Sequence, residues 1–391
     1  MVDPADQPEV LLFLVDAGSG HRNTARALVA ASEESRVAWR FRLVNYQSIF
    51  DQLDFTRHIT GLSVEDLYNF LLRRQWTGTL VPLLRVLHLL IRLRRKALLR
   101  SLTDFLAAQR PRPAALLSVA PHFNGVLRDA ARQALPGVPV VVQLTDYADY
   151  PPGFWIEPGV DRVIVGCEYA VQQALRLGLP RERITRTSGM VIHASFSKPV
   201  PPDARHCLRS EMGFADGDLV LLMIFGGKGS AVMPRLAEAL LRESPEWRVI
   251  AVCGENADLV ARMQRAAAHS GRIHVLGFTQ RVPELMAASD MVVTKPGPGT
   301  LAEAFQMRVP VLVVGNWRTI PQERYNTRLV AAQDLGLVVH RWADAPAAVK
   351  RWCQDPAAQA RTRANLAGLP ENRAAHDALD VLRAEMGLER T

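Results

Sequence analysis

The sequence has few cysteines and no long apolar run. Four cysteines are scattered through its 391 residues, and no two have the C-x-x-C spacing. This argues against a disulfide framework or a structural zinc site and fits a reducing compartment. Because no run of about 18 uncharged apolar residues is present, we expect no membrane-spanning helix. Residues 1–9 contain no basic or apolar signal region, so we expect a cytoplasmic protein.

Acidic residues are missing from residues 67–103. That segment holds eight Lys and Arg residues, which equals the net charge of +8 for the whole chain. The rest of the chain therefore sums to zero. A protein that concentrates its excess charge in one segment is expected to meet an anionic partner there.

Within this segment, residues 83–102 show the pattern of a basic amphipathic helix that Pro82 can open. Such a helix can lie on an anionic membrane, with its apolar face among the acyl chains. Packing against a protein core with a solvated basic face is the alternative. Nucleic-acid binding is disfavoured, because few aromatic residues are interleaved with the cations. We expect residues 67–103 to contact an anionic membrane surface.

Apolar strand patterns alternate with helical ones along most of the chain. Strands are predicted at residues 10–15, 40–44, 116–119, 138–144, 162–165, 219–225, 248–253, 273–276, 291–293 and 310–314. The alternation predicts an α/β protein with doubly wound parallel sheets. A proline-rich run at 198–204 interrupts the series. We therefore expect two domains, residues 1–198 and 199–391, with the last helices possibly crossing back onto the first domain.

The segment from Met291 to Ala304 predicts a phosphate-binding turn. An apolar strand is followed by a glycine turn at Gly297 and Gly299 and then by a helix. Thr300 and Glu303 have the spacing of a capping box, which places Thr300 at the helix N-cap. The free N–H groups of such a helix N-terminus bind phosphate, although a capped strand-to-helix connection without a ligand is the alternative.

Two further glycine turns follow predicted strands. His21 follows Gly18-Ser-Gly20, and its side chain suits a general base acting on a hydroxyl group. The second turn is Gly226-Gly227-Lys228-Gly229, which could bind a diphosphate through its N–H groups and the Lys228 ammonium. Neither turn is a dinucleotide G-x-G-x-x-G or a Walker A motif. The only D-x-D, at residues 216–218, lies in a predicted turn, so we expect no metal site.

Taken together, these residues resemble the family of monogalactosyldiacylglycerol synthases and processive diacylglycerol glycosyltransferases, and more distantly the peptidoglycan lipid-linked N-acetylglucosaminyltransferase. The resemblance covers residues 10–340. The matching motifs are Asp16-x-Gly-Ser-Gly-His21 with Ala25, Pro158-Gly-Val-Asp-Arg162, Gly178-Leu-Pro180, Ser195-Phe196, Gly226-Gly-Lys-Gly229, Cys253-Gly254 with Asn256, Gly277-Phe278 and Thr294-Lys-x-Gly-Pro-Gly-Thr-x-Ala-Glu-Ala304.

The resemblance implies a GT-B fold of two Rossmann-like domains and metal-independent, inverting transfer from a UDP-sugar, without a cofactor. It implies a hexosyl transfer from UDP-galactose or UDP-glucose to diacylglycerol at a membrane. His21 would be the catalytic base. The implied donor-binding residues are Gly226, Gly227 and Lys228, then Gly297, Gly299 and Thr300 at the diphosphate, Glu303 at the ribose, and Gln322, Glu323 and Asn326 at the sugar.

The sequence departs from the family in the sugar-binding run. The usual Pro-Gly-Gln-Glu-x-x-Asn lacks its glycine in Pro321-Gln-Glu-Arg-Tyr-Asn326, and Trp317, Arg318 and Arg324 accompany it. An added arginine could pair with the carboxylate of a uronic acid. The acceptor-side motifs also differ, at residues 118–122, 156–158 and 189–193. A polyprenyl-linked or soluble acceptor, a UDP-sugar 2-epimerase and a non-enzymatic sugar-nucleotide sensor remain open.

Overall fold

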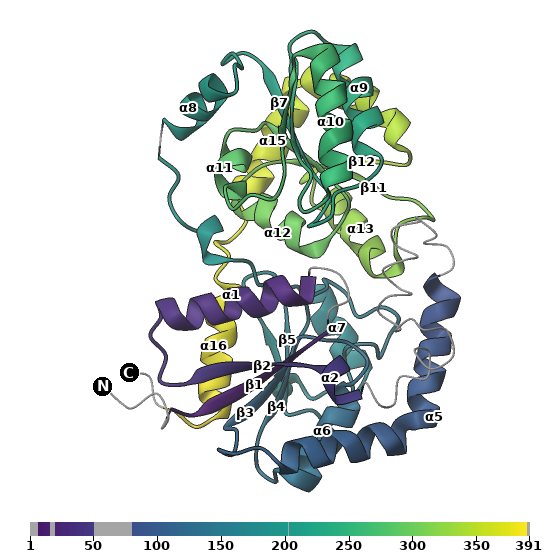
Figure 1. Ribbon diagram of the computed structural model, residues 1–391, viewed down its shortest axis with the longest axis vertical. Coiled ribbons are helices and arrows are strands. Elements are labelled where there is room, and N and C mark those ends of the chain that lie inside the picture. The colour runs from purple at the N-terminus through teal and green to yellow at the C-terminus, as the bar shows by residue number, and fades with distance from the viewer. Residues whose placement is uncertain (1–6, 16–19, 51–79, 202, 389–391) are drawn as a thin grey trace. The chain divides into compact units, whose positions relative to one another are not determined.

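The computed structural model describes residues 7–15, 20–50, 80–201 and 203–388, and Figure 1 shows its elements. They form two compact units. The first comprises residues 1–194 and 372–391 together with 320–322, and the second comprises residues 195–319 and 323–371. Each unit has its own six-stranded sheet in which all neighbouring strands are parallel.

The sheet of the first unit has the order β2-β1-β3-β4-β5-β6. Its strands are β1 (Glu9–Leu14), β2 (Arg40–Asn45), β3 (Ala115–Ser118), β4 (Val140–Gln143), β5 (Arg162–Val165) and β6 (Ile184–Arg186). Its helices are α1 (Gly20–Glu34), α2 (Tyr46–Phe50), α5 (Leu80–Ala107), α6 (Asn124–Ala134), α7 (Glu168–Arg176) and α16 (Ala374–Glu385).

Helices cover both faces of this sheet, which explains why its inner strands β1, β3 and β4 are buried, mostly apolar runs. Alternate residues of β1 point to opposite faces. Val10, Leu12 and Leu14 pack into a core with α1 and α16. Leu11 and Phe13 pack into a second core with α2, α5 and α6.

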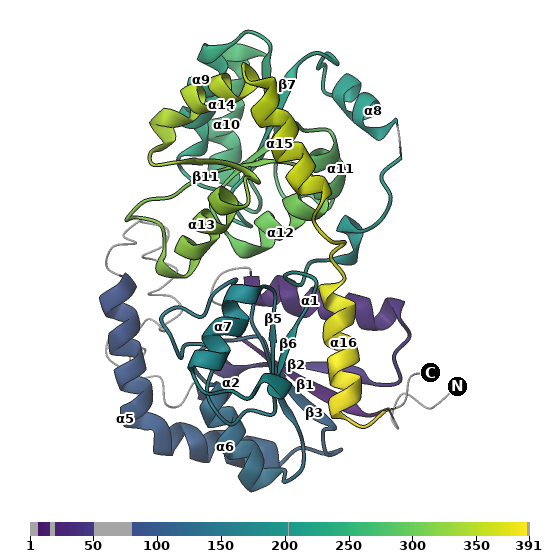
Figure 2. The same cartoon turned by 180° about the vertical axis from the view of Figure 1, so that it is seen from behind.

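The C-terminal helix α16 completes the first unit although the chain builds the second unit before it (Figure 2). Its buried residues pack against α1 and β1. Asp377 accepts hydrogen bonds from the backbone N–H and the hydroxyl of Ser188, at 2.9 and 2.8 Å. Arg162 and Glu385 form an ion pair at 2.6 Å. Residues 372–388 are therefore an integral part of the first unit.

The sheet of the second unit has the order β12-β11-β10-β7-β8-β9. Its strands are β7 (Leu219–Ile224), β8 (Trp247–Val252), β9 (Ile273–Leu276), β10 (Met291–Thr294), β11 (Val311–Val314) and β12 (Gly336–Val339). Its helices are α8 (Ala204–Glu211), α9 (Met233–Glu243), α10 (Ala257–Ser270), α11 (Val282–Ala287), α12 (Pro298–Gln306), α13 (Arg324–Ala332), α14 (Ala345–Cys353) and α15 (Pro356–Ala367).

The strand order creates one switch point in each sheet. In the second unit the chain runs outward from β7 to β9 and then returns to build β10 on the other side of β7. In the first unit the switch lies between β1 and β3. Ligands of open parallel sheets bind beyond the carboxyl ends of the strands at such a point. The loops that follow β1, β3, β7 and β10 are therefore the places to look for a site.

Helix α5 differs from its prediction. It is described from Leu80 to Ala107, so Pro82 lies within its first turn and the helix continues five residues beyond the predicted end at residue 102. Proline is tolerated there because the first N–H groups of a helix have no partner within it. The remainder of the predicted basic segment, residues 67–79, lies outside the described residues. None of the helices that the structure describes is long and apolar enough to cross a bilayer.

Candidate functional site

His21 lies in the first turn of α1, and not on the glycine turn before the helix as the sequence suggested. Its Nδ1 is 2.7 Å from the carbonyl oxygen of Val119, which follows β3. The hydroxyl of Thr145 is 3.3 Å from the same nitrogen. The start of α1 and the residues that follow β3 and β4 thus meet at His21.

The partners of His21 define its protonation state. A carbonyl oxygen can only accept a hydrogen bond, so Nδ1 carries the hydrogen and Nε2 keeps its lone pair. Burial lowers the pKa of His21 to about 4, and the hydrogen bond to Val119 opposes this only in part. The imidazole is therefore neutral at pH 7 and can accept a proton at Nε2.

Trp155 packs beside His21, with the ring centroids 5.7 Å apart. Its indole N–H donates to Asp146 at 3.0 Å. The buried Asp149 accepts the backbone N–H groups of Gly153, Phe154 and Trp155 at 2.8–3.0 Å. Burial raises the pKa of Asp149 to about 6, although these hydrogen bonds oppose the shift. The hydrogen bonds around Trp155 and Asp149 could not be predicted, because neither residue belongs to a recognisable motif.

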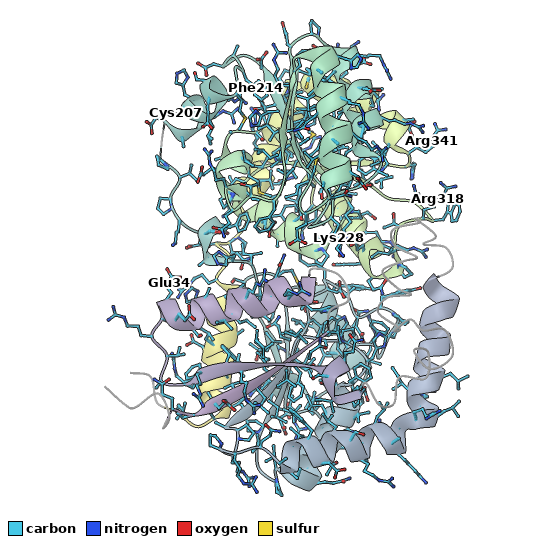
Figure 3. All side chains as sticks on the ribbon, in the orientation of Figure 1. Glu34, Cys207, Phe214, Lys228, Arg318 and Arg341 are labelled. Atoms are coloured by element: carbon cyan, nitrogen blue, oxygen red, sulfur yellow. The ribbon has the colours of Figure 1, made fainter. Side chains whose placement is uncertain are left out.

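In the second unit, the loop after β7 holds the glycine turn at residues 226–229. Gly226 and Gly229 have φ values of 73° and 61°, which glycine adopts without strain. A Cβ at Gly254 would overlap the carbonyl group of Gly227, so the turn packs directly against the loop after β8. Asn256 donates to the Lys228 carbonyl at 3.1 Å. The Lys228 side chain is exposed (Figure 3).

The predicted capping box is wrong. Helix α12 begins at Pro298, its N-cap is Gly297, and Thr300 is therefore the third residue of the helix. Glu303 lies beyond the first turn. Proline at the first helical position supplies the fixed φ that starts the helix earlier than the Thr300 pattern suggested. The first turn offers the N–H groups of Gly299 and Thr300, which have no carbonyl partner within the helix.

Several predicted donor-site residues gather at this first turn. Glu323 Oε1 is 3.5 Å from the position of a Cβ at Gly297. Asn326 donates to the Pro296 carbonyl at 2.7 Å. Within the described part of the chain, Thr294 Oγ1 and Asn326 Oδ1 are buried without a hydrogen-bond partner. Buried polar atoms without partners are rare in proteins, so they mark a place where a polar ligand can bind.

Glu303 and Gln322 complete the predicted set. Burial raises the pKa of Glu303 to about 7, so its carboxyl group is partly protonated at neutral pH. Gln322 is buried in the short 3-10 helix Pro321–Glu323, and its Oε1 has no partner among the described atoms. Gln322 and His21 both belong to the first unit and are described with that unit alone, whereas Glu303 belongs to the second.

The structure also gives a partner to Lys295, which belongs to the matching motif but had no predicted role. Lys295 follows β10 directly, and its Nζ is 2.6 Å from Glu323 Oε1. Its position between the strand and the glycine turn was visible in the sequence. Its partner was not, because Glu323 is 28 residues away along the chain.

The arginines of the sugar-binding run are already engaged. Arg324 donates to the carbonyl groups of Thr319 and Trp317 at 3.1 and 2.9 Å. Arg318 stacks on Trp317, with the guanidinium carbon 5.0 Å from the ring centroid. Trp317 is 68% exposed. Arg324 therefore shapes the loop, since two of its five N–H donors bind backbone carbonyls.

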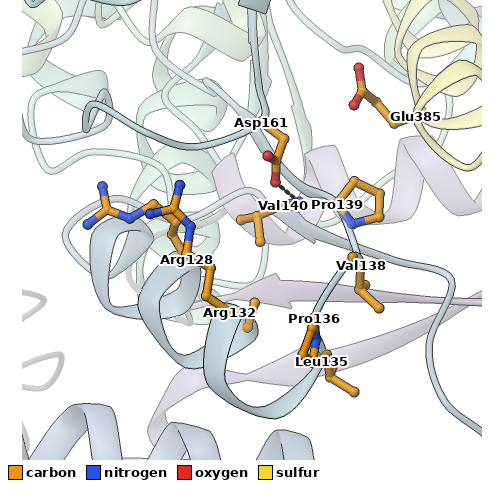
Figure 4. Close-up of a pocket in the computed structure, with 11 residues that line it drawn as sticks. Arg128, Arg132, Leu135, Pro136, Val138, Pro139, Val140, Asp161 and Glu385 are labelled. Carbon is orange, nitrogen blue, oxygen red and sulfur yellow. Dashed lines mark hydrogen bonds between the residues drawn. The ribbon is translucent and has the colours of Figure 1, made fainter.

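A cavity of about 490 Å³ lies elsewhere, at the amino ends of β4 and β5 (Figure 4). Its charged groups bind other parts of the protein. Arg128 contacts Asp129 and the Pro158 carbonyl, Glu385 pairs with Arg162, and Asp161 accepts the N–H of Val140 at 2.8 Å. The cavity is therefore no candidate for the reaction site.

No group of three His, Cys, Asp or Glu residues in the described ranges is placed to hold a metal ion. A metal-independent reaction stays a prediction. In the second unit, charge on a leaving group would be met by the N–H groups of α12 and by lysine side chains.

Comparisons with known proteins agree with this architecture. Residues 221–375 match the model of the glycosyltransferase family 28 C-terminal domain. A probable monogalactosyldiacylglycerol synthase of Nicotiana tabacum is 27% identical over 333 residues, which cover 80% of this chain and 58% of that protein. A processive diacylglycerol beta-glucosyltransferase of Bacillus pumilus is 28% identical over 210 residues, which cover 53% of this chain and 52% of that protein.

The chain thus spans between half and two thirds of the length of these two relatives. Among solved structures, Acinetobacter baumannii MurG aligns over 96% of this chain and 100% of its own, with a TM-score of 0.62 and 12% identity. That likeness shows the fold. The chain has the GT-B fold, its residues 221–375 match the glycosyltransferase family 28 C-terminal domain, and it is similar to the monogalactosyldiacylglycerol synthases and the processive diacylglycerol glucosyltransferases.

Proposed function

We propose that the protein is a peripheral-membrane, inverting glycosyltransferase that moves a hexosyl group from a UDP-sugar to diacylglycerol. One observation carries the proposal. The glycine turn after β7 and the open first turn of α12 lie at the switch point of the second sheet, beside the buried unpartnered atoms of Thr294 and Asn326. N–H groups at such a place suit a diphosphate, and buried polar atoms suit a nucleotide sugar.

In this reaction His21 is the general base. Its Nε2 takes the proton of the acceptor hydroxyl as the oxygen attacks the anomeric carbon of the donor. The bond from that carbon to the diphosphate oxygen breaks, and UDP leaves with the electron pair. The hydrogen bond from Nδ1 to Val119 holds the tautomer that this step needs.

For the donor we propose a neutral hexose, supplied as UDP-galactose or UDP-glucose. The carboxylate of Glu323 can accept hydrogen bonds from sugar hydroxyls, whereas it would repel the carboxylate of a hexuronate. Of the two added arginines that could pair with a uronic acid, Arg324 donates to loop carbonyls and Arg318 stacks on Trp317. The names of the two relatives refer to galactosyl and glucosyl products on diacylglycerol.

For the membrane contact we propose one face of α5. Leu89 and Leu93 are 56% and 71% exposed. With Lys96 and Arg100, also exposed, they follow the spacing of neighbours on one helix face. The opposite face packs into the core through Leu98, Leu102 and Leu106. The helix covers the sheet, as the alternative predicted, and we propose the membrane contact for the apolar and cationic stripe on its outer face.

The deciding experiment measures product formation from UDP-glucose, UDP-galactose, UDP-glucuronate and UDP-N-acetylglucosamine. The acceptor is diacylglycerol in anionic vesicles, and chelator is present in every reaction. We expect a glycolipid from UDP-glucose or UDP-galactose. Conversion of a UDP-sugar without acceptor would indicate an epimerase. Transfer only to polyprenyl-linked or soluble acceptors would overturn the lipid assignment, and UDP binding without turnover would indicate a sensor.

A further inference from the structure

Lys295 occupies a position between the two glycine loops of the second unit. Its Cε is 3.8 Å from where a Cβ would stand on Gly226 and 3.5 Å from the equivalent position on Gly297. Neither glycine has a side chain to fill this space. The lysine stem therefore lies against the backbone of both loops that would hold a diphosphate.

The ammonium of Lys295 is held in place by a nearly buried carboxylate. Nζ is 2.6 Å from Glu323 Oε1, and the side chain of Glu323 is only 7% exposed while that of Lys295 is 47% exposed. The pairing offsets the cost of burying the carboxylate. An ammonium has three N–H donors, and Glu323 takes one of them. Two donors remain beside the glycine loops.

Lys228, the cation that the sequence pointed to, has no comparable support. Its side chain is exposed, and its loop is held through its backbone carbonyl. Lysine side chains lose considerable entropy when a ligand fixes them, whereas a lysine that already forms an ion pair has lost much of that freedom. Lys295 is therefore the better-placed cation for an anionic ligand at this turn.

From this geometry we infer that Lys295 is a bridging residue, which binds the diphosphate of the donor with one N–H while it positions Glu323 with another. The inference rests on the proposed UDP-sugar site and names a further residue of that site. It predicts that the diphosphate and the sugar-binding carboxylate are linked through a single ammonium group. Loss of the lysine would weaken the binding of a ligand more, the more phosphate groups that ligand carries.

The test compares the affinities of uridine, UMP and UDP by titration calorimetry for the wild type, Lys295→Met and Lys295→Arg. We expect Lys295→Met to bind UDP at least about tenfold more weakly and uridine as the wild type does, since a charge-assisted hydrogen bond is lost. Lys295→Arg should recover part of the affinity. The matched control is Lys350→Met, because Lys350 also pairs with a glutamate in this unit, at 2.9 Å, and is 49% exposed.

A double variant separates bridging from simple neutralisation of Glu323. Lys295→Met with Glu323→Gln leaves no unpaired buried charge, so folding is preserved. UDP, which lacks the hexose that Glu323 is proposed to bind, should still bind weakly to this variant. Recovery of wild-type UDP affinity would overturn the inference, as would unchanged UDP affinity in Lys295→Met. If the wild type itself fails to bind UDP, the proposed function fails, and not only the role of Lys295.

Discussion

At the scale of single residues, environment decides what His21 can do. Its tautomer follows from one carbonyl oxygen, and its low pKa follows from burial. A glycine turn and a histidine in the sequence indicated a base. They could not reveal Val119 or Thr145 as its partners, because these residues lie 98 and 124 positions away.

The pH dependence of kcat/KM tests the state of His21. The base acts when it is deprotonated, so the fall in activity that belongs to His21 should come only as the pH drops through about 4. Because Glu303 has a pKa of about 7 and is assigned to the donor, kcat/KM for glycolipid formation is measured in the wild type and in Glu303→Gln. An acidic limb near the ordinary histidine value of about 6.5 that persists in Glu303→Gln would contradict the burial argument.

His21→Ala is the companion variant for this profile. Loss of a general base should lower kcat by roughly 10²- to 10⁴-fold and remove the acidic limb. UDP affinity, which is assigned to the second unit, should not change. Full activity in a folded His21→Ala protein would show that another group takes the proton.

At the scale of elements, the sequence predicted the strands whose burial gives a clear apolar pattern and missed the strands that lack one. Ten of the twelve strands were predicted, with errors of a few residues at their ends. Both missed strands, β6 and β12, lie at sheet edges, where fewer residues are buried and the apolar run is weaker. The capping pattern predicted the wrong first residue for α12, because Pro298 starts the helix before Thr300.

Helix α5 carries the prediction for this scale. A fourfold variant should no longer float with anionic vesicles, since both the apolar and the charge attraction are removed. Its substitutions are Leu89→Ser, Leu93→Ser, Lys96→Glu and Arg100→Glu. UDP affinity should be unchanged. Arg95 is left out of the exposed stripe because it pairs with Asp129 of α6.

The control for the α5 stripe is a set of substitutions of equal charge elsewhere, Arg351→Glu and Lys350→Glu on α14 of the second unit. These should leave vesicle binding intact. The wild-type protein should also lose binding as salt is raised, because screening weakens the attraction between exposed charges. Vesicle binding by the α5 variant at the wild-type level would refute the assignment of this face.

At the scale of the whole molecule, the division of the chain places two buried leucines of consecutive helices in different units. Leu366 of α15 belongs to the second unit and Leu382 of α16 to the first, and both are fully buried. Truncation of a buried leucine costs roughly 2–5 kcal/mol. Leu382→Ala should therefore speed amide exchange in peptides that contain β1 and β3, and Leu366→Ala in peptides that contain β10 and β11.

Hydrogen exchange followed by mass spectrometry reads both units in one experiment, and each variant serves as the control for the other. Exchange that rises in the same peptides for both variants would place the boundary elsewhere than between residues 371 and 372. The sequence suggested that the last helices cross back. It could not say which of them do. Both α15 and α16 are rich in alanine, and a helical pattern in the sequence does not show which domain the helix packs against.

The return of α16 sets an order for biosynthesis. A ribosome makes β1 and α1 before the second unit, yet α16, the helix that packs on them, is made after it. Every strand and helix of the second unit is synthesised before residue 372, so that unit has all its parts while the first still shows apolar surface around Leu28. The unit that is begun first is thus completed only after the other unit has been made.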